Sequence, residues 1–281
     1  MKLAQKLVVN YLRARLNLLA VVSKKRAAKK AFALFSTPFR KPKKKTPPIF
    51  SKGEKLSFKL DANTTIRGHR FNHPSKDKVL IIHGFESASK NFDRYISAFV
   101  KKGYEVLAFD APAHGQSDGK RIILPMYIET IKTIDRLYGP INKFMAHSFG
   151  GLALAHFLEF VSHDESTKAV FIAPATETTT AIDTFFKFLD LSPEVRKEFD
   201  QLIFEKAGVY ADHFSVRRAM HHIKATGLWL HDEDDDLTPL SDALKVKEDQ
   251  HPNLEFIITK GLGHRKIYRD NIVKRKIVDF L

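Results

Sequence analysis

Short apolar runs alternate with longer amphipathic stretches from residue 54 to the end of the sequence. Such runs are typical of buried strands, and apolar residues at helical spacing are typical of helices that cover a sheet. The first two runs, Lys55–Leu60 and Thr65–Phe71, predict an antiparallel hairpin. Buried parallel strands are expected at Val79–His83, Glu105–Phe109, Lys143–His147, Ala169–Ile172, Gly227–His231 and Leu254–Ile258. The alternation predicts an α/β protein with one doubly wound, mostly parallel sheet.

The stretches between these runs predict the helices of the same domain. They are Lys90–Lys101, Pro125–Leu137, Phe149–Val161, Pro239–Glu248 and Arg265–Leu281. One segment departs from the alternation, because residues 175–222 have a helical pattern and contain no predicted strand. We therefore expect a helical insertion there.

The first 50 residues follow a different pattern. Helices are expected over Leu3–Val22 and Lys24–Phe35, and the Pro- and Lys-rich residues 40–48 predict an extended linker. Apart from Arg15, the polar residues of the first helix fall in one narrow stripe: Lys2, Lys6, Asn10, Arg13 and Asn17. Because polar residues interrupt the apolar run, a transmembrane span and a cleaved signal peptide are disfavoured. We predict a basic amphipathic arm over residues 1–50 and an α/β domain with its insertion over residues 51–281.

Charge separates the same two parts. The net charge is +15, and residues 1–50 contain 14 Lys and Arg and no acid, whereas the remaining 231 residues contain 33 basic and 32 acidic residues. The near-equal numbers of basic and acidic residues over 51–281 do not indicate a nucleic-acid-binding domain. An apolar helix face beside many cations is typical of a helix on an anionic membrane surface, so we expect a cytoplasmic protein that is peripherally membrane-associated. The alternatives are that this face packs on the α/β domain or a second subunit, or that the arm is a mitochondrial-type targeting segment.

Composition excludes several kinds of chemistry. The chain has 281 residues, 43% hydrophobic and 28% charged, as globular proteins do. It has no cysteine, which excludes disulfides, a cysteine nucleophile and a cysteine-based zinc site. His114, His221 and His222 lack a spacing that suggests a metal, and we interpret them as structural residues. No cofactor and no metal are predicted.

Two serines are candidates for a nucleophile at a sharp turn. Ser117 lies in Gly115–Gly119, which matches Gly-x-Ser-x-Gly, but no strand leads directly into it and no apolar helix follows. Ser148 lies in Ala146–Gly151, which has Ala in place of the first Gly, yet a predicted strand leads in and a predicted helix leads out. A strand–turn–helix is the context that such a serine needs. The sequence favours Ser148, with a helix-capping role as the alternative.

Five motifs, taken in order, resemble the α/β-hydrolase superfamily over residues 54–281. His83-Gly84-Phe85 follows the third strand, where that family keeps its oxyanion loop, and residues 110–117 are similar to Asp-x-Pro-Gly-x-Gly-x-Ser. The Ser148 segment comes next. Residues 231–239 are similar to the acid loop His-Gly-x-x-Asp-x-x-Val-Pro, and Gly261–His264 to the histidine loop. The order serine, acid, histidine is the one that this fold uses.

The resemblance implies a catalytic triad. Ser148 would be the nucleophile, His264 the general base, and Asp235 the acid when residues 231–239 are aligned with the family's loop. Asp234 is the alternative acid. The backbone N–H groups of Phe85 and Phe149 would form the oxyanion hole. Asp232 stands where the family usually has Gly, a position that favours positive φ.

The implied function is hydrolysis of a small apolar carboxylic ester or thioester through an acyl-enzyme. The insertion at 175–222 corresponds to the family's helical cap, and its aromatic residues either roof an acyl-binding pocket or form the cap's own core. Two alternatives remain open. One is the same fold with other chemistry, as in a perhydrolase or a C–C hydrolase. The other is a membrane-tethered binding protein without catalysis.

Overall fold

The computed structural model describes residues 3–40 and 45–281. The predicted linker over 40–48 lies partly outside the described residues, as does Lys2 of the predicted polar stripe. The chain divides into two compact units, one made of residues 1–37 and 177–215 and the other of 38–176 and 216–281. We call them the helical unit and the sheet unit and describe each by itself.

The sheet unit is built on eight strands in the order β1-β2-β4-β3-β5-β6-β7-β8. β1 and β2 form the expected antiparallel hairpin, β2 pairs antiparallel with β4, and all the other neighbours are parallel. The strands are β1 Glu54–Asp61, β2 Thr64–Phe71, β3 Lys78–Ile82, β4 Glu105–Phe109, β5 Lys143–His147, β6 Lys168–Ile172, β7 Thr226–Asp232 and β8 Leu254–Thr259. The predicted fold class is confirmed.

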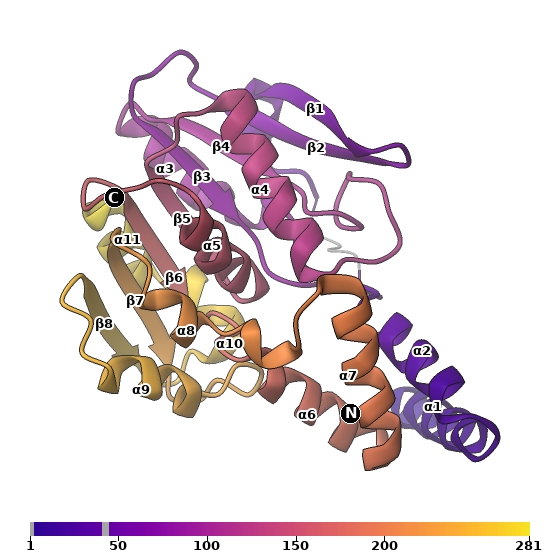
Figure 1. Ribbon diagram of the computed structural model, residues 1–281. Coiled ribbons are helices and arrows are strands. Elements are labelled where there is room, and N and C mark those ends of the chain that lie inside the picture. The colour runs from indigo at the N-terminus through magenta and orange to yellow at the C-terminus, as the bar shows by residue number, and fades with distance from the viewer. Residues whose placement is uncertain (1–2, 41–44) are drawn as a thin grey trace. The chain divides into compact units, whose positions relative to one another are not determined.

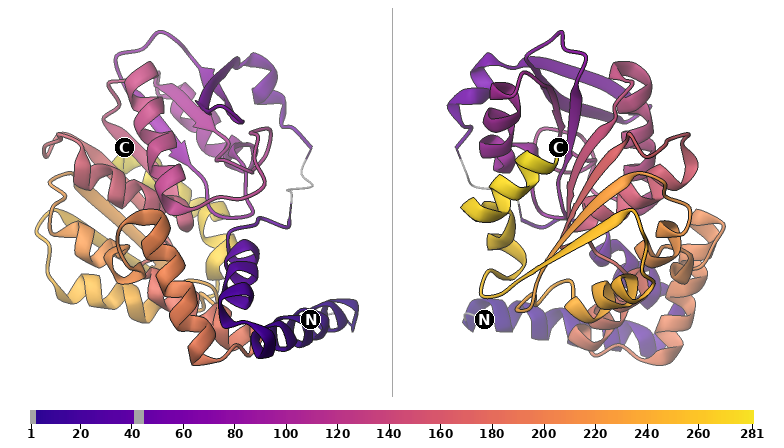
Figure 2. Two further views of the ribbon diagram at one scale, coloured as in Figure 1. Left: turned by 45° about the vertical axis from the view of Figure 1, so that its right-hand side comes forward. Right: turned by 90° about the vertical axis from the view of Figure 1, so that its left-hand side faces the viewer.

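Helices cover both faces of this sheet (Figures 1 and 2). One face carries α3 (Asp93–Lys101) and α11 (Asn271–Phe280), which contact each other. The other face carries α4, α5, α8 and α9, which contact one another in sequence. Their bounds are Leu124–Tyr138, Phe149–Phe160, Val216–Met220 and Leu240–Glu248. Because both faces are covered, the central strands are buried except at the first residue of β5 and of β6, which explains their continuous apolar runs.

The prediction of a single C-terminal helix over Arg265–Leu281 is wrong. The segment divides into α10 (Gly263–Lys266), a 3-10 turn over Ile267–Arg269 and α11. Asp270 causes the break, because its side chain accepts hydrogen bonds from the N–H groups of Ile272 and Val273 and so caps α11. The helix expected from Lys90 likewise begins as a short 3-10 turn, Ser89–Phe92, ahead of α3.

The helical unit joins the N-terminal helices to the insertion. α1 (Leu3–Val22) packs on α2 (Lys24–Phe35), and α2 packs along α7 (Pro193–Ala207) (Figure 1). α6 (Thr178–Leu189) completes the unit and contacts α1. Four aromatic rings from α2 and α6 surround the fully buried Phe199 of α7: Phe32, Phe35, Phe185 and Phe186. These rings form a core that the insertion shares with α2, a partner that the sequence analysis did not name.

Helix α1 has one packed face and one exposed apolar face. Leu16 and Ala20 are buried. The predicted polar stripe lies partly on the packed side, since the Arg13 guanidinium donates a hydrogen bond of 2.8 Å to the Phe188 carbonyl of α6. The opposite face leaves large apolar side chains in solvent: Leu7, Val8, Tyr11, Leu18, Val21 and Val22. Among the described residues, no helix combines the length and apolar character that crossing a membrane requires.

Candidate active site

Ser148 occupies a strained turn between β5 and α5. Its backbone adopts φ 57° and ψ −124°, a conformation that L-residues rarely take outside functional turns. The Ser148 N–H donates to the Ile172 carbonyl of the neighbouring strand at 3.0 Å, which fixes the turn at the carboxyl end of the sheet. In parallel sheets this end is where ligands bind.

Two glycines let the chain close around this serine. A Cβ on Gly150 would lie 2.6 Å from the His83 carbonyl oxygen, and a Cβ on Gly84 would lie 2.7 Å from the Ser148 Cβ. Both approaches are too short for any side chain, so the loop after β3 and the start of α5 require glycine. The small residues that the sequence places around Ser148 therefore have a steric cause.

A hydrogen-bonded chain links Ser148, His264 and Asp235. His264 Nε2 lies 2.9 Å from Ser148 Oγ, and His264 Nδ1 lies 2.8 Å from Asp235 Oδ2. The imidazole is 6% exposed and the carboxylate is wholly shielded from solvent. Because the carboxylate accepts only, Nδ1 carries the proton, and Nε2 presents its lone pair to the serine hydroxyl. The structure thus brings together the three side chains expected to form a triad.

The Asp235 carboxylate is held ionised despite its burial. Burial alone raises the pKa of an acid, but the hydrogen bond and charge of His264 oppose it, and the pKa of Asp235 lies below its ordinary value. The N–H groups of Leu237 and Thr238 add two donors to Oδ1, at 2.9 and 2.8 Å. The loop therefore delivers a fixed negative charge to the imidazole.

The neighbouring acids have different partners. Asp234 accepts the Gly261 N–H at 2.9 Å, and its carboxylate has no hydrogen bond or ion pair to His264 among the described residues. Asp232 is fully buried, and its carboxylate accepts the N–H groups of Leu262 and Gly263 and the Thr259 hydroxyl. Asp232 therefore ties the histidine loop to the end of β7. Asp232 does not use the positive φ that a glycine could adopt at this position, because it is the last residue of β7.

Thr238 is a site residue that the sequence analysis missed. Its hydroxyl lies 2.9 Å from Asp235 Oδ2 and 3.0 Å from His264 Nδ1. The sequence held a signal, since threonine stands here where the quoted acid-loop pattern has valine. His231 supports the same loop, because Trp229 donates to its Nδ1 and its Nε2–H donates to the Thr238 carbonyl at 2.7 Å.

His147, just before the serine, is also buried at the site. Its Nε2 lies 3.1 Å from the His264 carbonyl oxygen, and its ring packs between His264 and Tyr268. Burial, with a smaller contribution from the neighbouring His264, lowers the pKa of His147 to about 3. The ring is therefore neutral near pH 7 and donates to a backbone acceptor, so it positions the histidine loop without carrying charge.

Phe85 and Phe149 lie on the two segments that flank the serine. Phe149 is the first residue of α5, so its N–H has no acceptor within the helix. The rings of Phe85 and Phe149 meet edge to face with centroids 6.1 Å apart. Both residues are partly exposed.

Ser117 serves a different purpose. Its hydroxyl donates to the Asp110 carbonyl at 2.6 Å and accepts the Arg67 N–H at 2.9 Å. These bonds lock the loop after β4 onto β2. His114, interpreted as structural, accepts the Glu86 N–H at 3.0 Å. Burial lowers the pKa of His114 to about 4, so this acceptor stays neutral.

The sheet order and the turn at Ser148 are those of the α/β-hydrolase fold. A family model described as serine aminopeptidase, S33, matches residues 73–206. No curated protein sequence matches the chain.

Solved structures share this fold at low sequence identity. An esterase of Pyrococcus furiosus has a TM-score of 0.66 and 22% identity, over 88% of this chain and 97% of the other. The esterase Est1E of Butyrivibrio proteoclasticus, solved with ferulic acid, has a TM-score of 0.61 and 16% identity, over 80% and 97%. Mouse α/β-hydrolase domain-containing protein 10 has a TM-score of 0.59 and 17% identity, over 80% and 96%.

Proposed function

We propose that this protein is a serine hydrolase that cleaves a carboxylic ester or thioester through an acyl-enzyme. The observation that carries the proposal is the continuous hydrogen-bonded chain from Ser148 through His264 to Asp235. A serine hydroxyl is a weak nucleophile unless a base takes its proton, and His264 is placed to do so. A buried serine that merely capped a helix would need neither partner.

In the proposed reaction, Ser148 Oγ attacks the carbonyl carbon while its proton passes to His264 Nε2. The imidazolium is stabilised by the ionised Asp235 and then protonates the leaving alcohol or thiol. Water, activated by the same imidazole, attacks the acyl-enzyme and releases the acid. The backbone N–H groups of Phe85 and Phe149 receive the oxyanion, and one such donor is worth about 3–4 kcal/mol of transition-state stabilisation.

Ester substrates are favoured over peptides by the comparisons. Solved structures of the same fold include esterases, one of them solved with ferulic acid. The family model, described as serine aminopeptidase, supports a second candidate, removal of an N-terminal residue from a peptide. A panel of p-nitrophenyl esters of increasing acyl length, beside aminoacyl p-nitroanilides, separates the two. We expect hydrolysis of the esters.

A fluorophosphonate probe tests the nucleophile. Wild type and Ser117→Ala should be labelled, whereas Ser148→Ala should not react. Ser117→Ala is the matched control, since it removes the other serine hydroxyl in a Gly-x-Ser-x-Gly-like segment. Undiminished labelling of Ser148→Ala would refute the proposal, and absent labelling of wild type would favour a non-catalytic binding protein.

We further propose that the helical unit rests on an anionic membrane surface. Leu7, Tyr11, Leu18 and Val21 recur at helical spacing along the exposed face of α1, and Leu18 and Val21 are 71% and 80% exposed. Helix α2 adds exposed cations: Lys24, Lys25, Arg26, Lys29 and Lys30. Insertion of the apolar face of α1 into the membrane interface would favour binding. Each cation near an anionic surface adds about 1 kcal/mol to the binding free energy before screening.

Vesicle co-sedimentation tests this surface. The full chain should pellet with vesicles that contain phosphatidylserine, be released only in part by high salt, and bind weakly to phosphatidylcholine alone. The double variant Leu18→Asn/Val21→Asn should lose binding, while the control Ile272→Asn, which alters an exposed apolar side chain of the sheet unit, should keep it. If the double variant instead abolishes a dimer seen by size exclusion, the face binds a second copy and the membrane proposal fails.

A further inference from the structure

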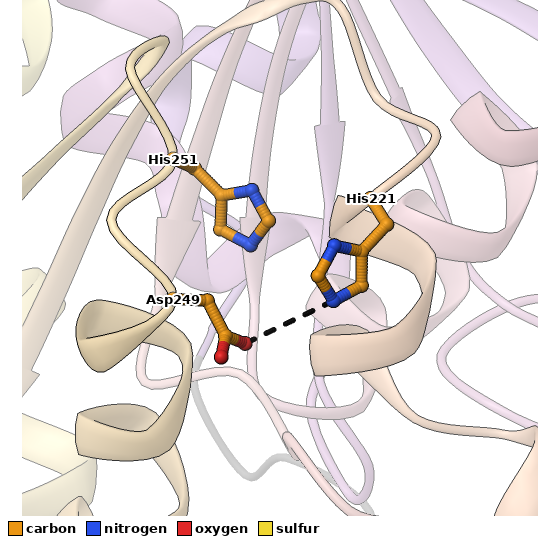
Figure 3. Close-up of side chains that lie close together, drawn as sticks. All are labelled: His221, Asp249 and His251. Atoms are coloured by element: carbon orange, nitrogen blue, oxygen red, sulfur yellow. Dashed lines mark ion pairs between the residues drawn. The ribbon is translucent and has the colours of Figure 1, made fainter.

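A cluster of metal-binding side chains lies in the sheet unit, away from the candidate active site. His221 follows α8, and Asp249 and His251 lie in the connection between α9 and β8 (Figure 3). One donor atom from each residue lies within 4.8 Å of the others. The sequence analysis did not predict this group, because residues 221 and 249 are far apart in the chain and the sequence showed no metal-ligand spacing.

The backbone between α9 and β8 turns the side chains of Asp249 and His251 toward His221. Gln250 has φ 53°, a left-handed conformation that reverses the chain between Asp249 and His251. As a result the rings of His221 and His251 meet edge to face with centroids 5.0 Å apart. His221 Nε2 lies 4.0 Å from Asp249 Oδ2, and the dashed line in Figure 3 marks this ion pair.

One donor in this group lacks a partner. His251 Nε2 is buried and has no hydrogen bond within the described part of the chain. A buried polar nitrogen without a partner is unfavourable, and coordination of an ion by its lone pair would relieve this.

Arg217 already holds the carboxylate of Asp249. Its Nε and Nη2 donate to the two carboxylate oxygens, each at 2.7 Å. These two hydrogen bonds occupy one lone pair of each carboxylate oxygen. A second lone pair stays available on Oδ2, the oxygen nearest His221. Ligating carboxylates are commonly hydrogen-bonded in this way, so Arg217 orients the ligand.

We propose that His221, Asp249 and His251 bind a divalent transition-metal ion of the zinc type. Two imidazoles and a carboxylate suit such an ion and do not suit Mg²⁺ or Ca²⁺, which prefer oxygen ligands. Tetrahedral zinc with bonds of about 2.0–2.1 Å brings its ligand atoms to about 3.4 Å from one another. The donors therefore approach by small side-chain rotations, and water fills the remaining position.

The position of the site assigns it a structural role. His221 precedes β7 and His251 precedes β8, whereas Asp235 and His264 follow the same two strands. The seven residues of β7 separate the two ends by about 20 Å. The ion would cross-link the connection before β7 to the connection before β8. Both connections lie at the end of the sheet opposite Ser148.

Zinc binding by the untagged full chain tests the proposal. Calorimetry with Zn²⁺ alone should give one site in wild type, and its affinity should fall at least tenfold in His221→Gln and in His251→Gln. His222→Gln is the matched control, because it changes an exposed histidine beside His221 that is not in the cluster. Zn²⁺ should also raise the melting temperature of wild type and of His222→Gln, and not of the two ligand variants.

The outcomes separate this site from the hydrolase. Ser148→Ala should bind Zn²⁺ as wild type does, so loss of hydrolysis leaves this test intact. Co²⁺ substitution should give the visible absorption of a tetrahedral site in wild type. His221→Gln and His251→Gln should not show this absorption. Equal Zn²⁺ binding by wild type and both ligand variants, or an equal loss in His222→Gln, would overturn the proposal.

Discussion

The hydroxyl of Thr238 lies 3.0 Å from His264 Nδ1 and also contacts the oxygen of Asp235 that this nitrogen faces. One side chain therefore touches both the acid and the base of the candidate triad. Its proton goes to the carboxylate, and its lone pair faces the imidazole N–H. Thr238 thus shares the carboxylate charge with His264 and acts as a positioning residue.

Thr238→Val removes this hydroxyl and keeps the shape of the side chain. We expect kcat to fall about tenfold, equivalent to about 1.4 kcal/mol, the lower end of the range for a hydrogen bond to a charged group. The acid limb of the kcat/KM profile should move to higher pH, because the carboxylate then stabilises the imidazolium without competition. Thr130→Val, a buried threonine of α4, is the control. An unchanged pH profile would leave Thr238 with a packing role only.

Asp235→Asn should lower the proposed ester hydrolysis more than any other change in the acidic loop. The amide cannot hold the imidazole in the required tautomer, and a loss of about 10⁴ in kcat is typical of this substitution. Asp234→Asn should stay within a few-fold of wild type, since its carboxylate bonds to the Gly261 N–H. Steady-state kinetics of the two purified variants on one ester give the comparison, and reversed effects would assign the acid to Asp234.

Stability should decline as the pH falls below about 6.5, the ordinary range of a histidine. Burial is the main cause that lowers the pKa of His114 to about 4 and of His147 to about 3, and it also lowers the pKa of His83 and His231. Between these values and 6.5 the unfolded chain binds protons that the folded chain does not, so the free energy of unfolding falls as pH falls.

Each such histidine contributes up to about 1.4 kcal/mol per pH unit. The lowered pKa of Asp235 acts in the same direction only below its ordinary value of 3.8. Urea unfolding between pH 7 and 4.5 measures the slope, which should be reduced in His147→Gln. A flat free energy of unfolding across this range would contradict the neutral buried histidines.

Phe199→Ala should destabilise the helical unit by about 3 kcal/mol, because it leaves a cavity among the aromatic rings of α2, α6 and α7. Deletion of residues 1–37 should have a similar effect, since it removes Phe32 and Phe35 from that core. Phe188→Ala, which changes a ring that is 44% exposed, should cost far less. Limited proteolysis within residues 177–215 reports the loosening, and equal resistance of Phe199→Ala and wild type would refute it.

The elements that local pattern determines were predicted well. The strands are flanked by turn signals and buried on both faces, so β4 and β5 have the predicted bounds. The break at Asp270 was missed because, in sequence, an N-cap aspartate within a helical pattern looks the same as an exposed aspartate of the helix. Only the structure shows its hydrogen bonds to the N–H groups of Ile272 and Val273. The orientation of α1 could not be read, because its packed face depends on α6, which lies far along the chain.

The candidate triad could be located because each of its residues lies in a motif at a strand end. The roles of the neighbouring acids could not be separated, since five carboxylates in a row look alike in sequence. Only the fold shows that Asp232 turns inward to backbone N–H groups while Asp235 faces an imidazole. The aligned position favoured Asp235, and burial and hydrogen bonding supply the physical reason.

The packing of α2 on α7 has a consequence for the order of synthesis. Residues of α7 leave the ribosome on the order of 150 residues after those of α2, which at 5–20 residues per second is roughly 8 to 30 seconds. During that interval the nascent chain displays Phe32 and Phe35 without the rings that later surround them. A chaperone or a nearby lipid surface would shield this stretch, and translation speed through the first half of the message becomes a determinant of yield.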